Sequence, residues 1–132
     1  IDWRDIHILL ADDNDLNRKI IIAYLEHTHA KISVAENGEI AVSLLQTDNT
    51  FDIVFMDIQM PVLDGLSATR RIRGELNSDI PLVAMTAHAN QDDIQKSVDA
   101  GMNAHIIKPV EPQFLVKTIQ TFLDERSVRR SD

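Results

Sequence analysis

The sequence contains no cysteine, and aromatic residues make up only 5% of its 132 positions. The absence of cysteine excludes a disulfide framework, a thiolate metal site and a cysteine nucleophile, and it is typical of a cytosolic protein. No apolar run approaches the roughly 20 residues of a membrane-spanning helix, and there is no signal peptide pattern. We therefore expect a cytoplasmic domain with no membrane contact of its own, although a longer parent protein could carry a membrane anchor.

The charge and length of the chain narrow its class further. The 21 acidic and 13 basic residues give a formal net charge of −8 at pH 7, which argues against non-specific binding to nucleic acid. A chain of 132 residues is long enough for one domain with a full hydrophobic core. It begins with Ile1 rather than methionine, so we expect a segment of a longer protein.

Short apolar segments alternate with amphipathic segments along the chain, which predicts strands alternating with helices. The expected strands are residues 6–11, 31–35, 51–56, 80–85 and 104–107. The expected helices begin near residues 16, 38, 66, 92 and 114, and the fourth ends at Gly101, a residue suited to a left-handed cap. Residues 1–126 form the predicted domain, and residues 127–132, which have no apolar pattern, are expected to be a frayed tail.

Five units of strand and helix predict an α/β fold, in which a parallel sheet is covered by helices on both faces. A closed barrel of this class needs about eight strands, so we expect an open, doubly wound sheet. Ligands of such sheets bind beyond the carboxyl ends of the strands. The residues near the end of each strand are therefore the candidates for a functional site.

Polar residues occur at the ends of four expected strands: Asp12 and Asp13, Asp57, Thr86, and Lys108. Each alone has a plain structural explanation, such as a helix N-cap or a turn. Together they bring three carboxylates to one sheet edge, where the carboxylates would repel one another without a cation. Oxygen ligands with no cysteine or histidine among them favour a hard ion such as Mg²⁺. A nearby hydroxyl and ammonium suit an anion, so the set predicts phosphoryl transfer to a carboxylate.

The chain resembles the receiver domain of two-component response regulators over nearly its whole length. The resemblance rests on six motifs in order: ADDN (11–14), ENGEIA (36–41), FMDIQMPVLDG (55–65), MTA (85–87), AGM (100–102) and KP (108–109). One such motif is weak evidence, but six at these spacings are highly specific. The resemblance implies a flavodoxin-like sheet of five strands in the order 2-1-3-4-5, with five helices. The segments DDNDLNRK and MDIQMPVLDGLSATRRIR are most similar to receivers of hybrid sensor histidine kinases.

The resemblance also implies roles for the residues of the predicted site. Asp57 matches the phosphoacceptor of the family. Asp13, Asp57 and the main-chain carbonyl of Gln59 match the ligands of Mg²⁺, and Asp12 matches a residue that assists through a water molecule.

Two further residues match the part of the family's site that contacts the phosphoryl group. Thr86 matches the hydroxyl that closes on this group, and Lys108 matches the lysine that pairs with it. In the family the peptide bond between this lysine and the following proline is commonly cis. We therefore expect a cis bond before Pro109, a geometry found in about 5–6% of such bonds in folded proteins.

His105 departs from the family pattern, because the residue three positions before the lysine is usually tyrosine or phenylalanine. Two interpretations stay open, a switch residue and a partly buried strand histidine packed for shape. Gln59, Ala87 and His88 match positions beside the site that tune the lifetime of the phosphoryl group in relatives. Simple exposure at the rim of the site is the alternative for His88 and Gln59.

The predicted function is signalling. The domain would accept a phosphoryl group from a phosphohistidine onto Asp57 and then change conformation near its fourth helix and fifth strand. It would catalyse only its own phosphorylation and dephosphorylation, with Mg²⁺ as cofactor. The expected partners are a histidine kinase core, in the same chain or another, and a histidine phosphotransfer domain, with no direct contact to nucleic acid.

Three alternatives to a receiver within a hybrid kinase stay open. The first is a stand-alone, single-domain response regulator. The second is an aspartyl-phosphate phosphatase of the haloacid-dehalogenase type, which needs a second acid where this chain has Gln59. The third is a flavodoxin-like flavin or nucleotide binder, which needs a glycine-rich loop that is missing after the first strand.

Overall fold

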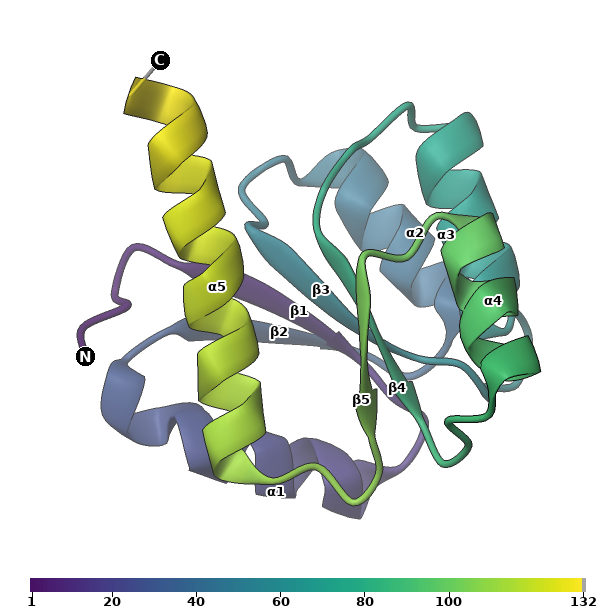
Figure 1. Ribbon diagram of the computed structural model, residues 1–132, viewed down its shortest axis with the longest axis horizontal. Coiled ribbons are helices and arrows are strands. Elements are labelled where there is room, and N and C mark those ends of the chain that lie inside the picture. Colours follow the sequence, from purple (N-terminus) through teal and green to yellow (C-terminus); the bar gives the residue numbers. More distant parts are fainter. Residues whose placement is uncertain (132) are drawn as a thin grey trace.

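Five parallel strands form the centre of the molecule (Figure 1). The computed structural model describes residues 1–131, with side chains up to residue 126. The strands run in the order β2-β1-β3-β4-β5, which confirms the expected fold class and strand order. Their bounds are β1 (His7–Ala11), β2 (Lys31–Ala35), β3 (Ile53–Asp57), β4 (Leu82–Thr86) and β5 (Ala104–Ile107).

Five α-helices cover the two faces of this sheet (Figure 1). One face carries α1 (Asp15–Leu25) and α5 (Pro112–Ser131), which contact each other. The other face carries α2 (Gly38–Thr47), α3 (Gly65–Gly74) and α4 (Gln91–Ala100). A short 3₁₀-helix, η1 (Glu26–Thr28), follows α1.

Two expectations from the sequence concern membrane-spanning helices and the carboxyl-terminal segment. None of the helices in the described part of the chain combines the length and apolar character needed to cross a membrane. The segment expected to be a frayed tail, residues 127–132, lies outside the described side chains, so that expectation stays a prediction.

Capping residues set the starts of four helices. Side-chain oxygens of Asn14, Asn37, Asp64 and Asn90 each accept a hydrogen bond from the backbone N–H three residues further on. Caps of this kind typically stabilise a protein by about 1 kcal/mol each. At the other end of α4, Gly101 adopts the left-handed conformation with φ 114°, as predicted.

Two of the predicted site residues lie inside strands rather than after them. Strand β3 extends to Asp57 and β4 extends to Thr86, each one residue further than expected. The parallel ladder pairs Asp57 with Met85, and the backbone N–H of Ile58 still donates to the carbonyl of Met85 over 3.2 Å. Backbone hydrogen bonding of the sheet therefore continues beyond Met56, where the apolar run ends.

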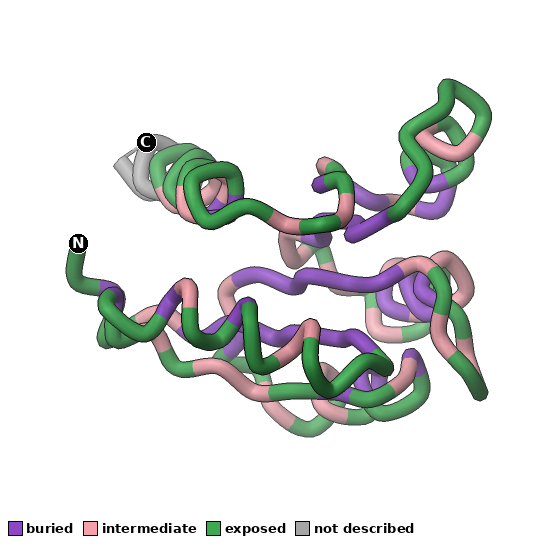
Figure 2. Tube along the Cα trace, turned by 90° about the horizontal axis from the view of Figure 1, so that it is seen from below, coloured by how far each residue is buried: buried purple, intermediate pink, exposed green. Residues whose placement is uncertain are grey.

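The sheet separates two apolar clusters. Buried residues lie along the inner strands, and exposed residues lie on the outer sides of the helices (Figure 2). Leu9 and Val54 belong to the cluster beneath α2 and α3, whereas Leu10 and Phe55 belong to the cluster beneath α1 and α5. All five residues of β3 are buried. This two-sided burial explains why the strand before Asp57 consists of four consecutive apolar residues.

The half-buried guanidinium of Arg73, at the end of α3, joins three segments of the chain. It donates to the carbonyls of Ser78 (3.1 Å) and Ile80 (2.6 Å) ahead of β4. It also donates to the carbonyl of Gly101 (3.0 Å) and to the side-chain oxygen of Asn103 (2.9 Å), between α4 and β5. Burial lowers the pKa of Arg73 below its ordinary value. These four bonds fix the carboxyl end of α4 to the body of the domain.

The loop between β3 and α3 contains a strained turn. The N–H of Leu63 donates to the carbonyl of Pro61 over 2.7 Å, which closes a γ-turn centred on Val62. Val62 has a φ of 70°, and its side chain is 80% exposed. A β-branched residue at positive φ is unfavourable because its Cβ crowds the backbone. The turn therefore stores strain that no burial of Val62 offsets.

A buried histidine lies at the amino end of β1. Nδ1 of His7 lies 2.8 Å from Oγ1 of Thr50, and Nε2 lies 2.8 Å from Oγ of Ser33. Thr50 donates its hydroxyl proton to Asp48 over 2.6 Å, so it accepts from Nδ1–H of His7. Nε2 then accepts from Ser33, which leaves the ring neutral. Burial first, and then the charge of Lys31, lower the pKa of His7.

Replacing Val62 with glycine should raise the free energy of unfolding by about 1 kcal/mol, because glycine adopts positive φ without strain. Val62→Ala, which keeps a Cβ, should give a smaller gain. Urea unfolding followed by circular dichroism measures both variants. A Val62→Gly protein less stable than the wild type would contradict the conclusion that Val62 is strained in this turn.

Stability should fall as the pH drops below 6.5, the ordinary pKa of histidine. Because the folded state disfavours protonated His7, the unfolded chain binds the proton first, and acid then shifts the equilibrium toward unfolding. His7→Gln should flatten this dependence, measured as the free energy of unfolding between pH 7 and pH 5. Equal slopes for the variant and the wild type would show that His7 is not the group involved.

Candidate functional site

The predicted site residues meet at the carboxyl edge of the sheet. They come from the ends of four strands, β1, β3, β4 and β5. Asp13, Asp57, Thr86 and Lys108 line one cleft of about 390 Å³, and Asp12 lies fully buried beside it. The structure thus brings together all five residues that the sequence analysis assigned to this edge.

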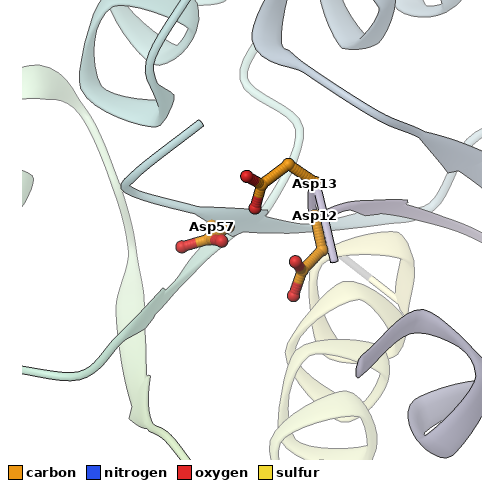
Figure 3. Close-up of side chains that lie close together, drawn as sticks. All are labelled: Asp12, Asp13 and Asp57. Carbon is orange, nitrogen blue, oxygen red and sulfur yellow. The ribbon is translucent and has the colours of Figure 1, made fainter. Parts of the chain in front are cut away.

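Three carboxylates form the acidic part of this site (Figure 3). One oxygen from each of Asp12, Asp13 and Asp57 lies within 4.8 Å of the other two. Their exposure differs, because Asp12 is 0% exposed and Asp57 5% exposed, whereas Asp13 is on the surface. The predicted carboxylate cluster is therefore present, with one member open to solvent and two held in the protein.

Lys108 supplies the positive charge nearest to these carboxylates. Its Nζ lies 2.9 Å from Oδ2 of Asp57 and 3.6 Å from Oδ2 of Asp12. The peptide bond between Lys108 and Pro109 is cis, as expected. One ammonium is thus shared between the two buried carboxylates.

The environment of Asp57 opposes its ionisation. Burial raises the pKa of Asp57 above its ordinary value of 3.8, and the charge of Asp12 acts in the same direction. The hydrogen bond and charge of Lys108 lower the pKa, as does the backbone N–H of Gln59, which donates to Oδ1 over 3.2 Å. The net effect is a pKa of Asp57 above its ordinary value, with burial as the largest cause.

One buried oxygen of Asp12 accepts no hydrogen bond from the described residues, although the ammonium of Lys108 lies 3.6 Å from it. Its Oδ1 accepts from the backbone N–H of Asn14 over 2.9 Å. Its Oδ2 is buried and has no hydrogen-bond partner among the residues that the structure describes. A buried carboxylate oxygen without a hydrogen bond is costly, and a water molecule or an ion bound there would remove that cost.

The donor set fits Mg²⁺. The three aspartates carry a formal charge of −3 against the +1 of Lys108, and the group consists of carboxylate oxygens alone. Hard divalent ions bind such oxygens, and Mg²⁺ typically uses a few carboxylates while it retains several water molecules. The unpaired Oδ2 of Asp12 suits a contact through one of those water molecules. An acidic group of this kind is typical of the magnesium site of receiver domains.

Thr86 and its loop border the same cleft. The hydroxyl of Thr86 donates to the carbonyl of His88 over 2.9 Å and accepts from the N–H of His88 over 3.0 Å. Ala87, His88 and Gln59 are exposed and line the cleft together with Asp57. In this conformation the Thr86 hydroxyl is bonded within its own loop, so its predicted contact with a phosphoryl group stays a prediction.

His105 lies apart from the cleft, and one interpretation of it was wrong. The residue is exposed on β5, not partly buried and packed for shape. Strand β5 is an edge strand whose only buried residue is Ile106, so His105 faces outward. It lines a separate surface hollow with Ile107 and Phe114. The switch role remains a prediction.

Arg18 also supports the site, although the sequence analysis did not single it out. Its guanidinium donates to the main-chain carbonyl of Asp12 over 2.6 Å and to the side chain of Asp15 over 3.1 Å. Arg18 therefore braces the turn that carries Asp12 and Asp13. The available signal is its position four residues after the N-cap Asn14, which points it back toward the preceding turn.

Comparison with known proteins identifies similar sequences in receiver domains and histidine kinases. The sequence profile of the response regulator receiver domain matches residues 8–120. The hybrid signal transduction histidine kinase I of Dictyostelium discoideum is 35% identical over 121 residues, which cover 86% of this chain and 7% of that protein. Histidine kinase 3 of Arabidopsis thaliana is 35% identical over 141 residues, covering 91% of this chain and 14% of that protein. The chain thus spans a small part of these relatives.

Two solved structures have the same fold. One is the receiver domain of the sensor histidine kinase PA1611 from Pseudomonas aeruginosa PAO1, solved with a magnesium ion coordinated in the active-site cleft. Its TM-score is 0.82 at 35% identity, and the match covers 90% of this chain and 98% of that one. The other is the receiver domain of Ssk1 from Saccharomyces cerevisiae, solved together with the histidine phosphotransfer protein Ypd1. Its TM-score is 0.85 at 29% identity, with 92% and 91% of the two chains covered.

Lys108→Met should raise the pKa of Asp57 further, because the variant removes the nearest cation and leaves the burial of the carboxyl group unchanged. Lys96→Met is the matched control, since Lys96 lines the same cleft but is not the lysine paired with Asp57. A titration of the Asp57 carboxyl carbon by NMR, without divalent cations, measures the change. An unchanged pKa in Lys108→Met would contradict the role of this ion pair.

Proposed function

We propose that this chain, which belongs to the response regulator receiver domain family, accepts a phosphoryl group from a phosphohistidine onto Asp57. The observation that carries this proposal is the pairing of a nearly buried carboxylate with an ammonium and two further carboxylates at the edge of the sheet. A carboxylate so held is directed at the cleft and is ready to act as a nucleophile.

The reaction is a transfer between two covalent carriers. A side-chain oxygen of Asp57 attacks phosphorus, the bond from phosphorus to the imidazole nitrogen of the donor breaks, and the imidazole leaves with the electron pair of that bond. The product is an acyl phosphate on Asp57. The protein's part is to hold the two reacting groups in line and to neutralise charge on the phosphoryl oxygens.

Mg²⁺ would be held by Asp13, Asp57 and the main-chain carbonyl of Gln59, with Asp12 contributing through a water molecule. When bound, the ion supplies positive charge to the phosphoryl oxygens and to the carboxylates. The acidic cluster and the unpaired oxygen of Asp12 support this ligand set. The magnesium ion in the active-site cleft of the PA1611 receiver domain independently supports Mg²⁺ as the ion.

Lys108 and Thr86 would contact the phosphoryl group after transfer. Lys108 already lies 2.9 Å from Oδ2 of Asp57, so its ammonium can pair with an oxygen added at that position. The hydroxyl of Thr86 must first release its two hydrogen bonds to His88. That release would move the loop of Ala87 and His88 and couple phosphorylation to the start of α4.

The effect of this movement would appear on the surface formed by α4 and β5. His105 lies on this surface, exposed, and is assigned a switch role there. Gln59, Ala87 and His88 line the cleft, so they are assigned the tuning of the lifetime of the acyl phosphate through access of water.

The setting of the domain, residues 1–126, would be a hybrid sensor histidine kinase. The two histidine kinases described above support this assignment, as does their much greater length. The partners would be a histidine kinase core and a histidine phosphotransfer domain. The complex of the Ssk1 receiver with Ypd1 supports the second partner.

Asp57→Asn should abolish labelling by a small phosphodonor such as phosphoramidate in the presence of Mg²⁺, because an amide cannot act as the nucleophile. Intact-mass spectrometry measures the added phosphoryl group, and removal of Mg²⁺ with a chelator should abolish labelling of the wild type as well. Asp124→Asn is the control, since Asp124 lies exposed on α5. Undiminished labelling of Asp57→Asn would refute the assignment of the phosphoacceptor.

A further inference from the structure

The start of helix α2 approaches the loop between β3 and α3 more closely than a side chain would allow. The backbone N–H of Gly38 donates to the carbonyl of Leu63 over 2.9 Å. A Cβ atom on Gly38 would lie 2.3 Å from that carbonyl oxygen and 3.0 Å from Cβ of Ala68. Cβ contacts under 3.0 Å essentially do not occur, so this approach requires glycine.

The same loop is fixed at its base by a second bond. The N–H of Gly65 donates to the carbonyl of Ile58 over 2.9 Å, and a Cβ on Gly65 would lie 2.2 Å from the carbonyl oxygen of Asp57. Gln59 therefore lies between two attachment points, the base of the loop and the Gly38–Leu63 contact. Its own N–H donates to Asp57.

We infer that Gly38 is a positioning residue of the metal site, which holds the loop between β3 and α3 so that the main-chain carbonyl of Gln59 can serve as a ligand. The inference rests on the proposed function, in which Mg²⁺ binds Asp13, Asp57 and that carbonyl. Gly38 is the first residue of α2 and follows the end of β2 by three residues. The segment after β2, which contributes no side chain to the site, would thus act on the site through the backbone of a neighbouring loop.

The coordination geometry of Mg²⁺ explains why the contact between Gly38 and Leu63 matters for the site. Mg²⁺ requires near-ideal octahedral geometry with bonds of about 2.0–2.1 Å, so it tolerates little displacement of a ligand. A side chain at position 38 must push the carbonyl of Leu63 from 2.3 Å to at least 3.0 Å. Groups that orient metal ligands typically change metal affinity by about 10–100-fold when they are altered.

Gly38→Ala should weaken Mg²⁺ binding about tenfold, measured by isothermal titration calorimetry on the unphosphorylated protein. Gly74→Ala is the matched glycine control, because a Cβ there meets nothing within 4 Å. Thr28→Ala controls for lost stability, since the buried Thr28 hydroxyl bonds to Leu25 and Ala30 at the opposite end of the sheet. Both controls should bind Mg²⁺ within about twofold of the wild type.

A Gly38→Ala protein that is folded by circular dichroism and binds Mg²⁺ like the wild type would overturn the inference and leave the proposed function standing. If Gly38→Ala does not fold, the double variant Gly38→Ala/Val62→Gly decides, because Val62→Gly should strengthen the fold. Weaker Mg²⁺ binding by the double variant than by Val62→Gly alone supports the positioning role, and equal binding overturns it. Absence of Mg²⁺ binding by the wild type would instead refute the proposed function and, with it, the inference.

Discussion

The site depends on one ammonium group that is shared between buried carboxylates. Lys108 contacts Asp57 directly and lies near Asp12, while Asp13 adds a third negative charge at the mouth of the cleft. Two unit charges about 4 Å apart interact by about 4 kcal/mol at an effective dielectric constant of about 20. Three carboxylates within 4.8 Å therefore exceed what one lysine can offset. The remaining repulsion is a cost to the fold that a bound dication would remove.

The fold and the members of the acidic cluster could be predicted from two features of the sequence. These are the spacing of apolar residues and the position of polar residues at the ends of the strands. Apolar runs such as the one before Asp57 indicate strands buried on both faces, and parallel strands end at a common edge. Residues near those ends must meet, whatever the details of packing. The predicted carboxyl ends of β3 and β4 were one residue short, because backbone ladders continue under polar side chains, and the predicted amino ends were two residues early.

Other features depend on tertiary contacts that leave no local trace in the sequence. Asn37 and Gly38 look like any helix start, and only the fold brings Leu63 against them. The exposure of His105 follows from β5 being an edge strand with a single buried residue. The hydroxyl of Thr86 has several partners within reach, so its hydrogen bonds to His88 depend on the shape of the following loop.

The four hydrogen bonds of Arg73 have a mechanical consequence for α4. One of them holds Gly101 at the end of the helix, while the other three tie Arg73 to the segments before β4 and β5. The buried residues of α4, Ser97 and Ala100, lie in that same half of the helix. The opposite end, at Asn90, is exposed and continues directly from the loop of Thr86. The helix is thus attached to the domain mainly near its carboxyl end, and its amino end lies beside the acidic cleft. The proposed displacement of the Thr86 hydroxyl would therefore act on α4 at the end that lies far from its attachment to Arg73.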